Sequence, residues 1–188
     1  MIDKERIFEA KRVLEAEGNA IFSTANKLDL NFSKCVDLII NCKGKIVISG
    51  IGKSGNIGRK ITSTLASLGT PSIFLHTSDA FHGDLGNLRK NDLLILISNS
   101  GETDELQKLL NYAKINGNKS IAITGNINSN ISKKANYCLD ASVESEACTL
   151  NLAPTCSTSV TMALGDALAI ICAMERGFKE IDFARFHP

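Results

Sequence analysis

The sequence has 188 residues, of which 44% are hydrophobic and 22% charged, a balance typical of one ordinary folded domain. This composition excludes a disordered tail and a small disulfide-linked scaffold. Lys and Arg number 21 and Asp and Glu 20, so the formal net charge is +1 and no overall field attracts nucleic acid or an anionic membrane. Any anionic ligand must therefore be held by a local site.

The cysteines and the first residues predict the compartment. No two cysteines have the spacing of a zinc site or of a disulfide framework; they stand at positions 35, 42, 138, 148, 156 and 172. The opening MIDKERIFEAKRVLEAEG contains no apolar signal region, and the longest charge-free apolar run around the core strands is LLILI, well short of the roughly 20 residues that cross a bilayer. We expect a cytoplasmic protein with reduced thiols, no metal and no membrane contact.

In chain order, two amphipathic helices are predicted first, over about 4–28 and 32–42. Short apolar bursts then alternate with helical stretches. The expected strands are 45–49, 72–76, 93–98, 120–124 and 137–141, and the expected helices are 54–68, 103–116, 129–135 and 157–176. Strands buried on both faces and joined by helices form parallel sheets. The prediction is one domain over 1–188: a helical segment (1–43), a three-layer α/β core with a five-stranded parallel, flavodoxin-like sheet (44–177), and a C-terminal tail (178–188).

A glycine-rich turn follows the first predicted strand, from Gly50 to Gly55. It satisfies the G-x-G-x-x-G pattern, but the second strand ends without the acidic residue that holds a dinucleotide ribose. A Walker A loop fails because Val47 stands where a glycine is needed. The remaining interpretation is a turn in which Lys53 and Ser54 bind a single phosphate or an oxyanion, although the glycines alone also suit tight packing.

Two further hydroxyl-rich loops precede predicted helices. The first carries Ser98, Asn99, Ser100 and Thr103, and the second runs from Thr155 to Ser159 directly after Pro154. A single hydroxyl explains an ordinary helix cap, whereas three such loops at the carboxyl ends of one parallel sheet favour one shared anionic ligand. With only one glycine-rich cradle, a monophosphate is the expected ligand.

Titratable side chains surround these loops. His82 lies in the loop after the second strand, and Glu105 lies one turn into the helix that follows the loop of Ser98 to Thr103. Glu144 and Glu146 lie in a polar loop after the fifth strand. Taken alone, each of these side chains is more often a solvated surface group. Together with Lys53 they supply an acid/base set around the predicted phosphate site.

The runs GIGKSGNIGRKI, AFHGDLG, SNSGETDE, EACTLNLAPTCSTS, GDALA and FARFHP together resemble the arabinose-5-phosphate isomerase family, which has the sugar isomerase (SIS) fold. The resemblance covers nearly the whole chain. It implies reversible interconversion of D-ribulose 5-phosphate and D-arabinose 5-phosphate, without a cofactor, in Kdo biosynthesis for lipopolysaccharide or capsule. Long members of the family continue past the HP dipeptide into a pair of CBS domains. This sequence lacks them, which leaves a natural short form or a chain cut at the domain boundary.

The resemblance also implies site residues and an assembly. Catalytic positions match Lys53, His82, Glu105, Glu146 and His187. Phosphate-binding positions match Ser54, Ser98, Ser100 and Thr103, with Asn99 in the same loop and Ser157 and Thr158 as further candidates. Family members resemble homotetramers, so His187, close to the chain end, is expected to act at a neighbouring subunit's site.

An aldose-ketose isomerase moves a proton between C1 and C2 through a cis-enediolate. We expect His82 to be the main acid/base group, with Glu146 its rival, Lys53 stabilising negative charge and Glu105 orienting the substrate. Three other interpretations stay open: another SIS isomerase, acting on a phosphoheptose or a hexulose 6-phosphate; a non-catalytic sugar-phosphate sensor; and, as the weakest, a dinucleotide oxidoreductase.

Overall fold

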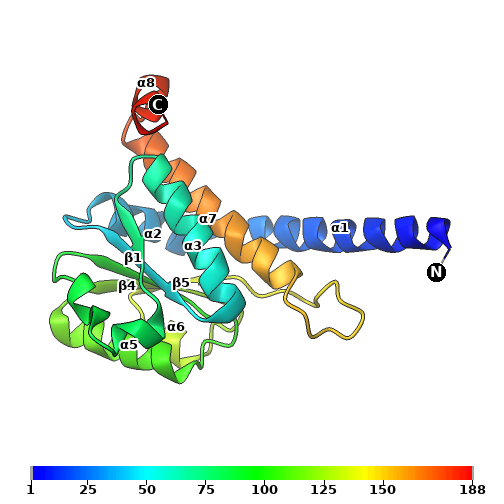
Figure 1. Cartoon of the computed structure of the whole chain (residues 1–188), viewed down its shortest axis with the longest axis horizontal. Helices are drawn as coiled ribbons and strands as arrows, with labels where there is room; N and C mark the ends of the chain where they lie inside the picture. Colours follow the sequence, from blue (N-terminus) through cyan, green and yellow to red (C-terminus); the bar gives the residue numbers. More distant parts are fainter. Residues whose placement is uncertain (1, 188) are drawn as a thin grey trace.

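The computed structural model describes residues 2–187, so Pro188 of the closing HP dipeptide lies outside it. A parallel five-stranded sheet lies between two layers of helices (Figure 1). The strands are β1 (Ile46–Gly50), β2 (Ser72–Phe74), β3 (Leu93–Ile97), β4 (Lys119–Thr124) and β5 (Tyr137–Asp140), in the order β2-β1-β3-β4-β5. The predicted α/β fold is confirmed, and the strand order is the flavodoxin-like one.

The helices include all six that the sequence pattern predicts and three short ones that it does not. They are α1 (Asp3–Asn26), α2 (Leu30–Ile40), α3 (Gly52–Ser67), α4 (Thr77–Ala80), the 3-10 helix η1 (Asp84–Asn87), α5 (Asp104–Asn116), α6 (Asn130–Lys134), α7 (Cys156–Glu175) and α8 (Glu180–Phe186). The additional helices are α4, η1 and α8, which have four to seven residues. Apart from α6, which the sequence does predict, segments this short show too few turns for hydrophobic periodicity to reveal them.

Each face of the sheet has its own apolar core. Alternate strand side chains such as Ile48 and Ile95 pack against α2, α3 and α7, whereas Val47 and Leu94 face α5 and α6. Strands β1 and β3 are buried throughout, as predicted, because helices cover both faces. The prediction that every strand is buried on both faces is wrong for the two edge strands: all three residues of β2 and three of the four residues of β5 are half-buried.

Helix α7 is the most apolar helix, and by length and composition alone it is long enough to cross a membrane. The apolar runs measured in the sequence lie only around the core strands, so they do not detect the apolar length of this helix. Ten of its residues are buried, and Gly165 lets it approach α3 closely: a Cβ at this position would lie 2.4 Å from the Ile61 side chain. Packing in the core therefore accounts for its hydrophobic composition.

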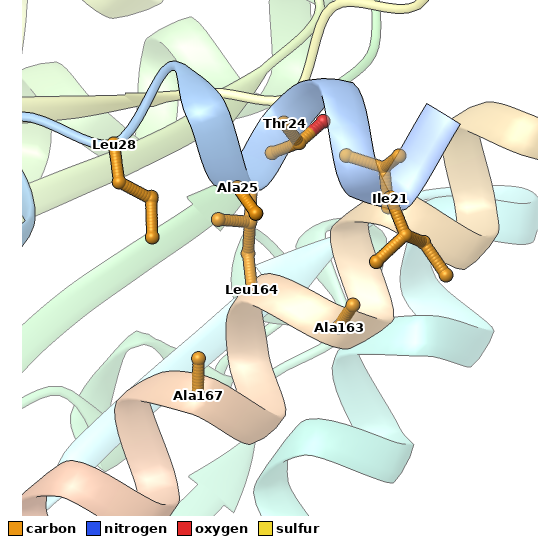
Figure 2. Close-up of a pocket in the computed structure, with 8 residues that line it drawn as sticks. Ile21, Thr24, Ala25, Leu28, Ala163, Leu164 and Ala167 are labelled. Atoms are coloured by element: carbon orange, nitrogen blue, oxygen red, sulfur yellow. The ribbon is translucent and has the colours of Figure 1, made fainter. Parts of the chain in front are cut away.

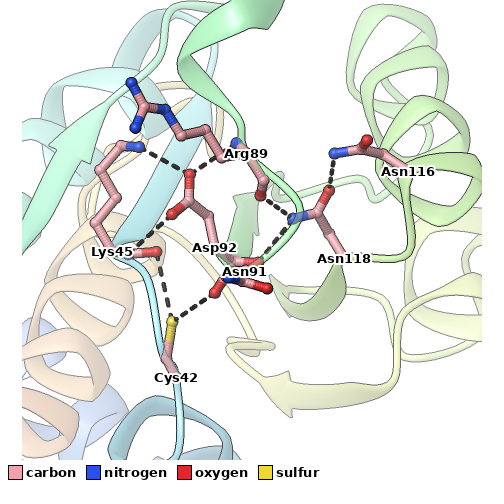
Figure 3. A network of polar contacts seen from close by, with 7 residues as sticks. All are labelled: Cys42, Lys45, Arg89, Asn91, Asp92, Asn116 and Asn118. Carbon is pink, nitrogen blue, oxygen red and sulfur yellow. Dashed lines mark hydrogen bonds and ion pairs between the residues drawn. The ribbon is translucent and has the colours of Figure 1, made fainter.

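At the amino-terminal edge of the sheet, a polar network around the buried Asp92 joins the segments that precede β1, β3 and β4 (Figure 3). Its carboxylate accepts hydrogen bonds from the Lys45 N–H (2.9 Å), the Lys45 ammonium (2.8 Å) and the Arg89 N–H (2.8 Å). Asn118 donates to the carbonyl oxygens of Arg89 and Asp92. Burial raises the pKa of Asp92, but the bonds from Lys45 and Arg89 outweigh it and hold the pKa below its usual range.

Helix α1 projects away from the body of the protein (Figure 1). Its C-terminal part packs against α7, and Arg12 donates to the carbonyl oxygen of Ala147 (3.0 Å). The apolar face predicted from its periodicity is not buried within the chain: Leu14 and Phe22 are both 71% exposed, and Ile7 is exposed as well. A single chain therefore leaves a long apolar helix face uncovered.

Candidate active site

The candidate site lies at the carboxyl-terminal edge of the sheet. Parallel pairing sets Gly50 opposite Ile97 and Ile97 opposite Ile123, so the loops after β1 and β3 begin side by side. Helices α3 and α5 start from these loops toward opposite faces of the sheet, as their separate cores require. The crevice at such a switch point is where α/β proteins of this type bind ligands.

The loop after β3 is held in a single conformation by its own hydroxyl groups. The Ser98 hydroxyl lies 2.9 Å from the Thr103 hydroxyl and accepts the Gly101 N–H at 3.0 Å. Gly101 has a φ of 67°, and a Cβ there would lie 2.0 Å from the Ser129 hydroxyl, so only glycine suits the position. Thr103 precedes α5 but makes no side-chain cap, so the first N–H groups of α5 still point at the loop. The exposed Ser100 and Asn99 complete the loop.

The turn after β1 provides a second start of a helix. Ile51 holds the cap position of α3 and has no side chain that can accept from the N–H groups of Gly52, Lys53 and Ser54. The Lys53 side chain is exposed and Ser54 is half-buried. An uncapped helix start with an adjacent ammonium group is suited to an anion, which is the interpretation drawn from the sequence.

Glu146 is tied to the start of α7. Its carboxylate accepts from the Thr155 N–H (2.8 Å), the Thr155 hydroxyl (3.1 Å), the Ser157 N–H (3.2 Å) and the Ser157 hydroxyl. Burial raises the pKa of Glu146, but these hydrogen bonds outweigh it and hold the pKa below its ordinary value. The nearby Thr158 hydroxyl donates to the carbonyl oxygens of Thr155 and Pro154. The hydroxyl protons of Ser157 and Thr158 are therefore directed at protein acceptors.

The segment between Glu146 and Thr155 is a tight loop. The Asn151 side chain accepts the Glu146 N–H at 2.7 Å, and Asn151 adopts a left-handed backbone with φ of 53°. The Cys148 thiol lies inside this loop, and N–H groups of Ala153, Leu152 and Leu150 lower its pKa. Backbone donors here stabilise negative charge on a side chain.

The loop after β2 carries two histidines around α4. His82 is exposed, and its backbone N–H donates to the backbone carbonyl oxygen of Asp79 (2.9 Å). His76 stands at the cap position of α4 and is half-buried; its Nδ1 is buried and has no hydrogen-bond partner among residues 2–187. The sequence pattern places His76 only at the end of the second predicted strand, 72–76, and assigns it no role. Its position at the carboxyl end of β2 was the available signal.

The two remaining predicted carboxylate and histidine positions lie apart from each other. Glu105 is the second residue of α5, so it lies within the first turn of the helix rather than one turn into it, and it is exposed. His187 follows α8, where its ring stacks on Phe183 with centroids 3.9 Å apart. Arg176 follows the last residue of α7. Its guanidinium donates to the Thr70 hydroxyl, just before β2, and to the Ile39 carbonyl oxygen in α2. Helix α8, which His187 follows, thus lies toward the amino-terminal edge of the sheet, opposite the loops described above (Figure 1).

An apolar groove of about 150 Å³ between α1 and α7 is separate from this edge (Figure 2). Its lining includes Ile21, Leu28, Ala163 and Leu164, and its hydroxyl group, on Thr24, donates to Ala20 within α1. It contains no titratable side chain and therefore offers no acid/base chemistry. Within residues 2–187, no grouping of three or more His, Cys, Asp or Glu side chains is arranged for a metal ion.

The fold and this edge define a sugar isomerase domain. The SIS domain family matches residues 38–171, and the chain belongs to this family.

Two relatives and one solved structure extend the comparison. Arabinose 5-phosphate isomerase KpsF of Escherichia coli is 50% identical over the whole chain, which covers 59% of that protein. Arabinose 5-phosphate isomerase KdsD of Pseudomonas aeruginosa is 48% identical over 97% of the chain, which covers 56% of that protein. The chain thus spans a little over half the length of these relatives. The structure of E. coli CFT073 c3406 in complex with arabinose 5-phosphate has a TM-score of 0.96 and 38% identity, with each chain covered completely.

Proposed function

We propose that the chain catalyses the interconversion of D-arabinose 5-phosphate and D-ribulose 5-phosphate in the cytoplasm, as a step of Kdo biosynthesis. The single observation that carries this proposal is the carboxyl-terminal edge, where a hydroxyl-lined loop, an uncapped helix start with Lys53 and the histidine-bearing loop after β2 all follow strands of one parallel sheet. The high identity to arabinose 5-phosphate isomerases and the likeness to a structure holding arabinose 5-phosphate support the choice of substrate.

The phosphate is assigned to the loop of Ser98, Asn99, Ser100 and Thr103 and to Ser54. The N–H groups at the starts of α3 and α5 add partial positive charge at this phosphate position. An anion can therefore be held locally although the net charge of the chain is only +1. Lys53 then stabilises the enediolate, and Glu105 orients the substrate at the rim.

His82 is assigned the proton transfer between C1 and C2. Support for His82 over Glu146 comes from their different surroundings: His82 is exposed in a loop, whereas both Glu146 oxygens accept hydrogen bonds. A carboxylate whose pKa is held low is a weak base. Glu146 is therefore assigned to positioning: it fixes the loop of 146–155 against α7, together with Ser157.

Sites shared between subunits of a homotetramer are part of the proposal. His187 and the carboxyl-terminal edge lie at opposite ends of one chain, so His187 reaches a site only from a neighbouring copy. The uncovered apolar face of α1 offers surface for such a neighbour. The test mixes two inactive variants, His82→Ala and His187→Ala, by unfolding and refolding them together. Recovery of activity supports sharing, and activity no greater than that of the separate variants contradicts it.

The reaction itself is tested by incubating the wild type with ribulose 5-phosphate in heavy water. We expect arabinose 5-phosphate to form and deuterium to enter at the exchanged carbon. Absence of both in the folded protein contradicts the proposed function. Turnover of a phosphoheptose or of a hexulose 6-phosphate in preference to ribulose 5-phosphate assigns the chain to another SIS isomerase.

A further inference from the structure

His76 lies at the carboxyl end of β2, and the mechanism proposed above does not use it. Its backbone is extended (φ −69°, ψ 129°), and the preceding Leu75 N–H still donates to the Ile48 carbonyl of β1 at 2.8 Å. Side chains alternate along extended backbone, so His76 shares a sheet face with Phe74. The two rings meet edge to face, with centroids 6.4 Å apart and an interplanar angle of 60°.

This face places His76 beside the first turn of α3. The Phe74 ring packs directly on that helix, because a Cβ at Gly58 or Gly55 would lie 3.0 or 3.4 Å from it. His76 is the next residue on the same face toward the carboxyl edge. Its ring therefore lies near the helix start that carries Lys53 and Ser54.

The two edges of the His76 ring have different surroundings. Nδ1 is buried and finds no partner within residues 2–187, whereas the residue as a whole is only half-buried, so the opposite edge with Nε2 reaches the surface. A neutral imidazole carries one N–H donor and one acceptor nitrogen. A buried N–H without an acceptor is rarer and more costly than an unshared lone pair. The proton of the neutral ring therefore belongs on Nε2, at the accessible edge.

We infer that His76 is a further catalytic residue: a neutral imidazole whose Nε2–H donates to the substrate oxygen that becomes negative in the enediolate. This inference rests on the proposed function. The base removes a proton from carbon, the C–H electron pair becomes the C=C bond, and the carbonyl pair moves onto oxygen. When the proton returns to the neighbouring carbon, the hydroxyl proton on that carbon's partner passes to the negative oxygen, so that a hydroxyl forms there and the new carbonyl forms on the other carbon. The His76 proton stays on nitrogen throughout, and its bond to the oxygen is strongest while that oxygen is negative.

Two substitutions separate the ring edges. The amide of His76→Asn reaches only the position of Nδ1, whereas the longer amide of His76→Gln reaches that of Nε2. Because a lost oxyanion donor costs about 10²-fold in kcat, we expect that loss in His76→Asn with little change in KM, and recovery of most of it in His76→Gln. Ser78→Ala, at an exposed position of α4, is the control. Equal activity of the Asn and Gln variants, or a fully active His76→Asn, overturns the inference.

A second measurement uses the wild type and needs no variant to fold. Nitrogen-15 NMR of labelled histidines at pH 7 is expected to show Nε2 protonated and Nδ1 bare for His76, with the Nε2–H resonance moving on addition of arabinose 5-phosphate. A proton on Nδ1, or an Nε2–H resonance unmoved by the sugar phosphate, overturns the inference. A wild type without turnover overturns the proposed function instead, so the two failures are distinguishable.

Discussion

The two ends of the parallel sheet are organised in opposite ways. At the amino-terminal end, the Asp92 carboxylate is buried, and three donors from Lys45 and Arg89 satisfy it. At the carboxyl-terminal end, the starts of α3 and α5 lack side-chain caps, Lys53 and His82 are exposed, and a buried ring nitrogen of His76 has no partner within 2–187. The comparison teaches that one end of the fold completes its own hydrogen bonds, and the other keeps donors available for a ligand.

The largest effect is expected at the carboxyl-terminal end. General acid/base groups contribute about 10²–10⁴-fold to rates, so His82→Ala should reduce kcat by a factor in that range. The thermal unfolding midpoint should stay near that of the wild type, because His82 is exposed and the interactions of its side chain do not stabilise the fold. Initial rates of arabinose 5-phosphate formation measure the loss. A variant with wild-type kcat assigns the proton transfer elsewhere.

The thiols provide the next comparison. Backbone N–H groups lower the pKa of Cys148 at the carboxyl-terminal end, whereas burial raises the pKa of Cys172, in the last turns of α7, to about 11. Only the thiolate reacts with iodoacetamide, and the rise in the pKa of Cys172 to about 11 lowers its thiolate population at pH 8 by about 10²-fold relative to an ordinary thiol. We expect Cys148 to be alkylated first at pH 8, as followed by peptide mass spectrometry. Modification of Cys172 before Cys148 contradicts this order.

A smaller effect is expected at the amino-terminal end. Asp92→Asn removes a charge-assisted acceptor from three donors and should lower the free energy of unfolding by about 2 kcal/mol, or the Tm by about 4–8 °C. Activity of the folded variant at low temperature should be unchanged. Because folding lowers the pKa of Asp92, its contribution to stability is complete above about pH 4 and is lost as the pH falls through the lowered value.

The control for this substitution is Asp166→Asn. Asp166 pairs with Lys60 between α7 and α3, but the Lys60 side chain is 44% exposed. Exposed ion pairs contribute about 0–1 kcal/mol, so this variant should unfold close to the wild type. Denaturant unfolding at pH 7 and at pH 3 compares both variants. Equal destabilisation by the two substitutions contradicts the special status of the amino-terminal network.

The sequence predicts the sheet and its larger helices well because their signals are local. Runs such as LLILI identify buried strands, and glycine or hydroxyl residues mark where helices begin. The position of Ser98 and Thr103 at a strand end is likewise enough to predict a loop at the carboxyl edge. Which hydroxyl bonds to which group is set by contacts distant in sequence, such as the approach of Gly101 to Ser129.

Two features of the site cannot be predicted from the sequence. Glu146 reads as a candidate base, but hydrogen bonds from Thr155 and Ser157, nine to eleven residues away, hold both of its oxygens. The isolation of His76 Nδ1 depends on packing around the Phe74 ring and α3, which no motif encodes. In both cases burial and partners, rather than residue type, decide what the group does.

Helix α8 lies toward the edge of the sheet opposite the hydroxyl-lined loops, and the proposed sharing of His187 between copies makes the expected activity depend on the amount of protein present. If each site includes His187 of another copy, an isolated chain has no complete site. Specific activity then rises with protein concentration until all chains are assembled. Dilution then lowers the activity without an inhibitor, a modification or a change in the fold of the single chain.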